Sequence, residues 1–355
     1  MEVNVMYEYV GNIHVHSTYS DGSGTVAEIA SAAQKARLDF VIITDHETLG
    51  GLLEKKNGWY GDTLVLIDTE LNRDDHHYLA FNLKEEISTR GLTPQDVIDR
   101  VNQKGGFGVI AHPFEKGSPI ILKGKHYPWR DWEVKDFKGI EIWNYTSLCR
   151  DAATSTLKVL WLYYIARGSV TRHPCPDSLK MWDKLLTRGF KVLALGGTDA
   201  HAIQWRWKGI KMNFFPYEYL FKTINTHVLL HEELSGEKHH DSQLIYQALK
   251  YGHFHTSNDR SLSSTGFRFT AENEKKRVIS GDSLPLNGET VLGVKSPDSR
   301  SLIRIIKDGQ VISQSKNSHL MLKVLEKGAF RAEVYSRPLV GKPRPWIYSN
   351  PIFVE

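Results

Sequence analysis

The chain has 355 residues, of which 41% are hydrophobic and 24% charged, as in a globular protein long enough for two domains or for one barrel with an appendage. Its net charge of +4 is small and spread out, so it gives no reason to expect a nucleic-acid-binding tract, although a local positive field would suit an anionic substrate. Two cysteines cannot form a disulfide framework, the first residues lack a signal-peptide pattern, and no apolar run reaches membrane-spanning length. We therefore expect a cytoplasmic protein with no membrane partner.

The first two-thirds of the chain alternate between predicted strands and helices. Thr25 and Glu28 form a capping box that predicts a helix to about Arg37, and Thr93 with Pro94 predicts the start of another. Apolar runs predict buried strands at 40–44, 63–68, 107–111, 139–143 and 191–195. Most of these runs are followed by a His, Asp or Glu residue, which is how a β/α barrel displays a site at the carboxyl ends of parallel strands.

Two later regions depart from this pattern. Residues 145–190 form an insertion whose apolar stretch at 157–166 predicts a helix, and this insertion could either cover the site as a cap or pack on the outside of the barrel; we favour the second. From about residue 260, short runs with partial alternation and the turn signal at Asp308-Gly309 predict a small β-sandwich-like domain. The predicted fold is α/β, with a barrel over residues 1–258 and a β-sandwich-like domain over residues 259–355.

A set of potential metal ligands follows the predicted strands. The members are His14, His16, Asp21, His46, Glu70, His112, Asp199 and His201, with Glu141 and Asn144 as possible additions. His14 and His16 are two apart on an extended segment, so both side chains should point to one side. Imidazole nitrogens combined with carboxylate oxygens suit Zn, Mn or Fe, and Glu70 could bridge two ions. Two ions about 3.5–4 Å apart can stabilise the attacking and leaving oxygens of a hydrolysis together.

Each piece of this set has an ordinary explanation when taken alone. The His14-Val15-His16 segment could lie on a surface strand, Asp45-His46 could cap a helix, and His112-Pro113 could form a turn. The repeated placement after apolar runs favours a metal site instead. The remaining histidines lack that context, and we expect most of them at the surface; they are His76, His77, His126, His173, His227, His231, His239 and His240. His253 and His255 could lie behind the ligands.

The segments that carry these residues resemble a known family in their order along the chain. They are His-Val-His-Ser-Thr-Tyr-Ser-Asp-Gly at 14–22, Thr-Asp-His at 44–46, Glu70, Ala-His-Pro at 111–113 and Gly-Thr-Asp-Ala-His at 197–201. This order resembles the polymerase and histidinol phosphatase (PHP) superfamily of metallohydrolases. The resemblance implies a distorted (β/α)7 barrel that hydrolyses phosphate esters with two or three Zn, Mn or Fe ions. Residues 331–352 further resemble the carbaryl-hydrolase-like (CehA/McbA) branch, which adds a β domain after the barrel.

The resemblance also implies how the ligands are shared. His14, His16, Glu70 and Asp199 would hold one ion, Glu70 and His112 a second, and Asp21, His46 and His201 a third. Trinuclear members place another His or Cys between the positions of His112 and Asp199, where this chain has Gly-Ile-Glu-Ile-Trp-Asn at 139–144. Glu141 or Asn144 could substitute there, or the second ion could be weak or absent.

The leading hypothesis is a metal-dependent phosphoesterase whose metal-bound hydroxide attacks a phosphate mono- or diester. Glu70, His112, Asp199 and His201 are the residues that we expect to act most directly. One alternative is a carbamate, carboxylic ester or amide hydrolase with the same centre, and another is a non-catalytic metal-containing binding module. A phosphate substrate would favour positively charged side chains near the opening of the site, whereas a neutral ester would favour aromatic ones. The chain has candidates of both kinds. The positive candidates are Arg73, Lys116, Arg130, Arg172 and Arg206, and the aromatic candidates are Trp129, Trp143, Trp205 and Trp207. The expected partner is a small ester substrate, phosphorylated in the leading hypothesis.

Overall fold

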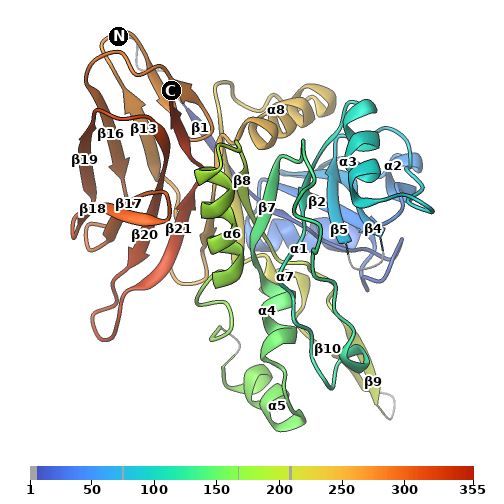
Figure 1. Ribbon diagram of the computed structural model, residues 1–355. Helices are drawn as coiled ribbons and strands as arrows, with labels where there is room; N and C mark the ends of the chain where they lie inside the picture. The colour runs from blue at the N-terminus through green and yellow to red at the C-terminus, as the bar shows by residue number, and fades with distance from the viewer. Residues whose placement is uncertain (1–5, 74–75, 167, 208–209) are drawn as a thin grey trace.

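The computed structural model describes residues 6–73, 76–166, 168–207 and 210–355 (Figure 1). A ring of strands lies at the centre of the first two-thirds; its members are β1 (Tyr7–Ile13), β2 (Phe40–His46), β4 (Thr63–Arg73), β5 (His76–Phe81), β6 (Phe107–Ile110), β7 (Gly139–Asn144) and β8 (Leu193–Gly197). A parallel bridge between Val15 and Ala200 joins the segments after β1 and β8 and so closes the ring. The short strand β3 (Gly58–Tyr60) is added on β4. The predicted α/β barrel is confirmed.

One strand of the ring runs in the opposite direction to the others. The pairs β1–β2, β2–β4, β6–β7 and β7–β8 are parallel. In contrast, β5 is antiparallel to both of its neighbours, β4 and β6. The amino end of β5 therefore lies beside the carboxyl ends of the other strands.

Two helices begin where their capping residues predict them. The helix bounds are α1 (Val26–Ala36), α2 (Gly50–Leu53), α3 (Pro94–Gln103), α4 (Tyr145–Ala152), α5 (Thr156–Tyr164), α6 (Pro176–Thr187), α7 (Tyr217–Leu220) and α8 (Lys238–Tyr251), with a 3-10 turn at Leu122–Gly124. The capping box of Thr25 and Glu28 is formed at the start of α1, and Arg37 ends that helix in the left-handed conformation. Thr93 and Asp96 form a second capping box at α3. No helix within the described ranges is long and apolar enough to cross a bilayer.

Alternation along the strands divides the ring into an inner and an outer layer. Phe40 and Ile42 of β2 belong to an apolar cluster with residues of the other ring strands and with Ile245 of α8. Val41 and Ile43 instead pack in a second cluster that contains residues of α1, α3 and α6. Because successive side chains point to opposite faces, the even-numbered positions of β2 and β4 face inward. The same alternation places His46 and Glu70 on the inner face, at the carboxyl ends of their strands.

Two excursions leave the ring directly after β7 and β8 and extend beyond the same end of it (Figure 1). The first is α4 with α5, which follows β7; the second is the hairpin of β9 (Gln204–Trp207) and β10 (Ile210–Asn213), which follows β8. The Tyr163 ring of α5 lies 4.6 Å from the Phe214 ring, just past the hairpin, so the two excursions touch. By contrast, α6 packs on β7 and buries Trp182, as expected of a helix on the barrel exterior.

The last third of the chain forms two antiparallel sheets. One contains β13 (Arg268–Glu272), β14 (Arg277–Ile279), β16 (Thr290–Lys295) and β19 (His319–Val324). The other contains β17 (Leu302–Lys307), β18 (Gln310–Ser315), β20 (Gly328–Ser336), β21 (Arg344–Ser349) and β22 (Ile352–Val354), with β15 (Ser283–Leu284) added in parallel. Phe269, Leu292, Ile305 and Phe330 join one apolar cluster with residues of both sheets. The predicted β region is confirmed, whereas the division at residue 258 stays a prediction because β12 (Phe254–Asn258) pairs with β21.

A buried ion network joins the ring to the β region. His227 of β11 (Ile224–Leu230) has its Nδ1 atom 2.9 Å from Glu8 Oε1 and its Nε2 atom 2.7 Å from Asp259 Oδ2. Glu8 also pairs with Arg268 of β13 at 2.5 Å. Burial opposes protonation, but the two carboxylates outweigh it and raise the pKa of His227 to about 9. The expectation that His227 lies at the surface is wrong, because Glu8 of β1, His255 of β12 and the segment with Asp259 and Ser264 lie against its ring.

We expect His227→Gln to lower the free energy of unfolding by about 3–5 kcal/mol, because it leaves the buried Asp259 carboxylate without its cation and Glu8 with Arg268 alone. The folded-state pKa of His227 is raised, so its contribution is complete below pH about 6.5 and is lost as the pH rises through about 9. The pKa values of Glu8 and Asp259 are lowered to about 2, so their contributions are lost as the pH falls below about 4.

The difference in urea midpoint between wild type and His227→Gln should therefore be largest at pH about 5–6 and should shrink toward pH 9. His231→Gln, at an exposed histidine just past β11, is the matched control and should keep the wild-type midpoint. Equal midpoints for His227→Gln and wild type at pH 6 would show that the network does not stabilise the fold.

Candidate metal centre

The eight ligands that the sequence predicts come together at one end of the ring. They follow or end its strands: His14, His16 and Asp21 after β1, His46 at the end of β2, Glu70 in β4, His112 after β6, and Asp199 and His201 after β8. Their atoms form overlapping groups in which each potential ligand atom lies within 4.8 Å of the others. These groups are His14, His16 and Glu70; His14, His112 and Asp199; Glu70, His77 and His112; and His16, Asp21, His46 and His201.

Glu70 occupies the middle of the cluster. Its Oε2 atom lies 3.2 Å from His14 Nε2 and 3.3 Å from His16 Nε2. The same oxygen lies 3.2 Å from His46 Nδ1. Its other oxygen, Oε1, lies 3.2 Å from His112 Nε2. The two carboxylate oxygens therefore face different imidazoles, which is the arrangement expected of a carboxylate shared by two ions.

His77 is a member of the cluster that the sequence analysis placed at the surface, and that expectation is wrong. Its side chain is buried, and its Nδ1 atom lies 2.9 Å from Glu70 Oε1. The rings of His77 and His112 are 5.1 Å apart. His77 stands near the start of its strand, and it reaches the site only because β5 runs in reverse. A search for ligands that follow apolar runs misses His77, because His77 precedes the apolar part of its strand. Its alternation with Leu79 and Phe81 on the inner face would identify it only if the direction of β5 were known.

Asp199 and Asp21 complete the side of the cluster that faces solvent. Asp199 Oδ1 lies 3.2 Å from His16 Nε2 and 3.4 Å from His201 Nδ1. Asp21 Oδ1 lies 3.1 Å from His201 Nε2. The side chains of Asp21, His46 and His201 are 58%, 21% and 15% exposed, whereas that of His16 is fully buried. A substrate therefore has access to the cluster from the side of Asp21 and His201.

Glu141 and Asn144 lie in a hydrogen-bonded layer behind the ligands. Glu141 Oε1 lies 3.1 Å from His14 Nδ1, and Oε2 accepts from the His112 backbone N–H at 2.9 Å. Asn144 donates from Nδ2 to Glu141 at 2.9 Å and caps α4 with its Oδ1 atom. These contacts direct His14 Nε2 toward Glu70, as second-layer carboxylates do in metal sites. Glu141 joins no group of close ligand atoms among the described residues, and the Asn144 Oδ1 atom is used to cap α4, so His77 is better placed to serve a second ion.

Glu115 supports His112 from the other side. Its Oε2 atom lies 3.4 Å from His112 Nδ1, and its Oε1 atom lies 2.5 Å from the Arg150 guanidinium. All three side chains are largely buried. Glu115 follows its ligand by three residues in a loop, without a strand or helix pattern that would single it out in the sequence.

The backbone at three ligands adopts an uncommon conformation. The φ angles of His14, His112 and Asp199 are 71°, 24° and 52°, in a region that residues other than glycine rarely enter. Such strain costs on the order of 1–3 kcal/mol per residue and often marks functional sites. A Cβ atom on Gly197 would lie 2.5 Å from the Ile13 carbonyl oxygen, so this glycine allows β8 to approach β1 closely.

The donor set fits divalent metal ions. Both ring nitrogens of His16, Nε2 of His77 and Nδ1 of His112 are buried and have no hydrogen-bond partner among the described residues. Buried polar atoms usually have partners, and a cation would supply them here. Burial opposes protonation of His16 and His112, but nearby carboxylates outweigh it, Asp199 and Glu70 at His16 and Glu70 and Glu115 at His112, and they raise the pKa of each histidine to about 9. In the absence of metal ions, protonated His16 and His112 thus balance the negative charge of the neighbouring carboxylates.

The structure does not place the described candidates for substrate contact at the metal ligands. Trp129 and Trp143 are buried in the apolar core, so neither is available to a substrate. The Lys116 ammonium lies 3.6 Å from Asp177, Arg130 is exposed, and Arg172 lines a separate pocket. The side chains of Arg73, Trp205, Arg206 and Trp207 lie outside the described residues.

Comparisons with known proteins give distant similarities. No family model matches the chain. An uncharacterized protein of Methanocaldococcus jannaschii is 28% identical over 145 residues, which are 38% of this chain and 80% of that protein. A two-domain protein of Bacteroides vulgatus that contains a predicted PHP-like metal-dependent phosphoesterase is similar over 98% of this chain and 95% of its own, with 13% identity and a TM-score of 0.44.

A second solved structure, from Bifidobacterium adolescentis and provisionally named a metal-dependent phosphoesterase, covers 56% of this chain and 88% of its own, with 17% identity and a TM-score of 0.34. Both structures are described as metal-dependent phosphoesterases, and the first as containing a predicted PHP-like one. The carbaryl-hydrolase-like branch stays a prediction. At these scores the similarities assign no substrate.

We expect the purified protein to carry at least two transition-metal ions per chain, and His77→Ala to carry about one fewer. His76→Ala is the matched control, because the neighbouring side chain points to the opposite face of β5 and joins no ligand group. Elemental analysis after purification without chelator measures both. Fewer than one ion per wild-type chain after metal is added back would rule out the centre, and an unchanged content in His77→Ala would remove His77 from it.

Metal binding should release protons. Because the pKa values of His16 and His112 are raised to about 9, both side chains carry protons at pH 7 that an ion must displace. The apparent affinity for Mn²⁺ should therefore rise between pH 6 and 9, by up to about tenfold per pH unit for each proton displaced. Calorimetric titration at pH 7 in two buffers of different ionisation enthalpy counts the protons, and a count of zero would contradict this description of the ion-free site.

Proposed function

We propose that this chain is a PHP-type metal-dependent phosphoesterase that hydrolyses a phosphate mono- or diester with two or three divalent transition-metal ions. The observation that carries the proposal is the position of Glu70, whose Oε2 atom faces His14, His16 and His46 while its Oε1 atom faces His77 and His112. A carboxylate between two sets of imidazole nitrogens suits two neighbouring ions.

The protein supplies a fixed and largely dry frame for this chemistry. Ions bound at such positions acidify water and neutralise the charge on phosphoryl oxygens. Glu70, His14 and His16 are almost completely buried, so their orientation is set before a substrate arrives and their electrostatic effect is little screened. Asp21 and His201 lie on the exposed side, where they would meet the ester group first.

Charge favours phosphate over a neutral ester as the substrate. A cluster of cations stabilises most strongly a transition state whose oxygens share negative charge, as in phosphoryl transfer. The burial of Trp129 and Trp143 also removes two of the four aromatic side chains that would have suited a neutral ester. Carbamate, carboxylic ester or amide hydrolysis at the same centre remains the alternative, and bound ions without any turnover would favour a binding module.

We expect faster hydrolysis of nitrophenyl phosphate or bis-nitrophenyl phosphate than of nitrophenyl acetate or a nitrophenyl carbamate, with Mn, Zn or Fe supplied. Rates corrected for hydrolysis by the metal alone should fall at least about a hundredfold in His112→Ala, since second-layer changes alone cost 10- to 100-fold. His126→Ala replaces a partly exposed histidine outside the ligand groups and should keep the wild-type rate.

Acetate or carbamate turnover that exceeds both phosphates and disappears in His112→Ala would move the assignment to the carbonyl hydrolases. No turnover of any of the four esters by protein with a full complement of ions would favour the binding module.

A further inference from the structure

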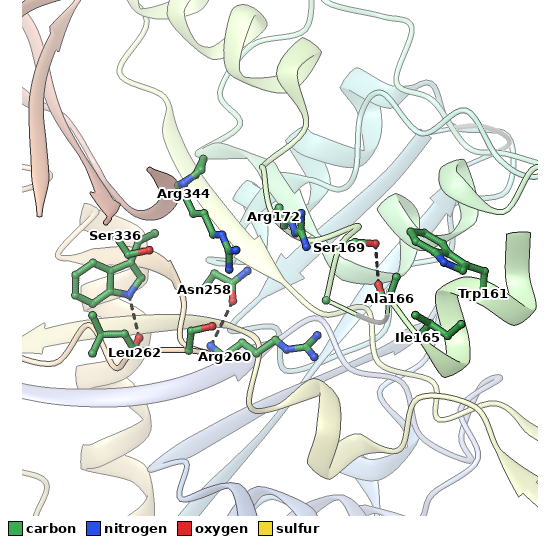
Figure 2. A pocket seen from close by; sticks show the side chains of 14 residues that line it. Trp161, Ile165, Ala166, Ser169, Arg172, Asn258, Arg260, Leu262, Ser336 and Arg344 are labelled. Carbon is green, nitrogen blue, oxygen red and sulfur yellow. Dashed lines mark hydrogen bonds between the residues drawn. The ribbon is translucent and has the colours of Figure 1, made fainter. Parts of the chain in front are cut away.

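A pocket of about 610 Å³ lies away from the metal centre, and none of the candidate metal ligands lines it (Figure 2). Three parts of the chain form its wall: the end of α5 with residues between 165 and 172 that the structure describes, the end of β12 with residues 260–262, and the β region at Ser336 and 344–346. Its volume falls in the range of small-molecule sites, about 300–1,000 Å³.

The wall of the pocket is rich in positive charge. Arg172, Arg260 and Arg344 line it, each from a different one of these three parts, and no Asp or Glu is among its lining residues. Figure 2 shows their side chains around the same space. None of the three forms an ion pair with a carboxylate in the described ranges of the chain. All three arginines are exposed to solvent, and an anion between them would gain charge-assisted hydrogen bonds from their planar donor groups.

The position of Arg260 is fixed by its neighbours. Its guanidinium donates from Nη1 to the Tyr219 hydroxyl at 2.7 Å and lies over the Tyr219 ring, 5.5 Å from its centre. Asn258 accepts from the Arg260 backbone N–H at 3.3 Å and donates to the Thr171 carbonyl at 2.8 Å, so it ties two walls of the pocket together. An arginine held in this way loses less conformational entropy when an anion binds.

The wall also offers apolar surface beside the arginines. Trp161 and Ile165, at the end of α5, line the pocket and remain 42% and 77% exposed. An aromatic or aliphatic group on a ligand would cover this surface, which a free inorganic anion could not do. The combination therefore selects an organic anion rather than an ion alone.

We propose that this pocket binds an organic anion, with its phosphate, sulfonate or carboxylate group held by Arg172, Arg260 and Arg344 and its apolar part against Trp161. This second site does not depend on the proposed phosphoesterase activity.

The test uses 8-anilino-1-naphthalenesulfonate, whose fluorescence reports binding, on the full-length protein supplied with metal. Its uncharged counterpart N-phenyl-1-naphthylamine lacks only the sulfonate. Arg172→Ala and Arg344→Ala should each weaken binding of the sulfonate at least tenfold and leave that of the naphthylamine unchanged. Arg344→Lys, which keeps the charge but loses the planar fork, should give an intermediate loss. Arg277→Ala, an exposed arginine outside the pocket, is matched in net charge and should bind as wild type does.

Wild-type affinity for the sulfonate in both pocket variants would overturn the proposal, as would an equal loss in Arg277→Ala. Metal content and turnover of bis-nitrophenyl phosphate, measured on the same samples, separate this outcome from a failure of the catalytic proposal. The pocket variants should keep the wild-type metal content and turnover. If the wild-type protein shows no turnover but binds the sulfonate in a way that depends on Arg344, the phosphoesterase proposal is wrong and the anion-pocket proposal stands.

Discussion

The structure depends on one buried carboxylate. Glu70 is almost completely removed from water and has imidazole nitrogens against both of its oxygens. An isolated carboxylate in such a place would be strongly destabilised unless it were protonated or paired. Its pKa is instead held well below the usual range: burial works against ionisation, but His14, His77, His46 and His112 outweigh it. Loss of the positive charge around Glu70, whether carried by bound ions or by protonated histidines, would therefore destabilise the whole cluster at once.

The rest of the ring brings the partners of Glu70 to it. Alternation on β2 and β4 fills the inner face with Phe40, Ile42, Leu64 and Leu66 before it reaches the ligands, so the apolar interior ends where the polar site begins. The uncommon backbone at His14, His112 and Asp199 turns those side chains inward just past their strands. Glu141, Asn144 and Glu115 then fix the orientation of the imidazoles. Packing, backbone strain and hydrogen bonding thus all restrict the same few side chains.

Local patterns in the sequence were enough to predict most of this arrangement. The capping box at Thr25, the strands with their inward ligands, and the change to β structure after residue 260 all depend on near neighbours, and the structure has each of them. His77 could not be predicted in this way, because its position depends on the direction of β5 relative to strands far away in the sequence. His227 is buried for a similar reason: Glu8, His255 and Asp259, which lie far from it in the sequence, surround its ring. The pocket arginines at 172, 260 and 344 show the same limit, since only the folded chain brings them together.

The most direct test of the account is the position of the ions relative to Glu70. Anomalous X-ray diffraction from crystals grown with Mn²⁺ or Zn²⁺ locates each ion without assuming its ligands. We predict at least two peaks, one between Glu70 Oε2 and the nitrogens of His14 and His16, the other between Oε1 and the nitrogens of His77 and His112. Each should lie at a coordination distance of about 2.0–2.2 Å from its carboxylate oxygen. A single ion, or ions that Glu70 does not contact, would contradict the account.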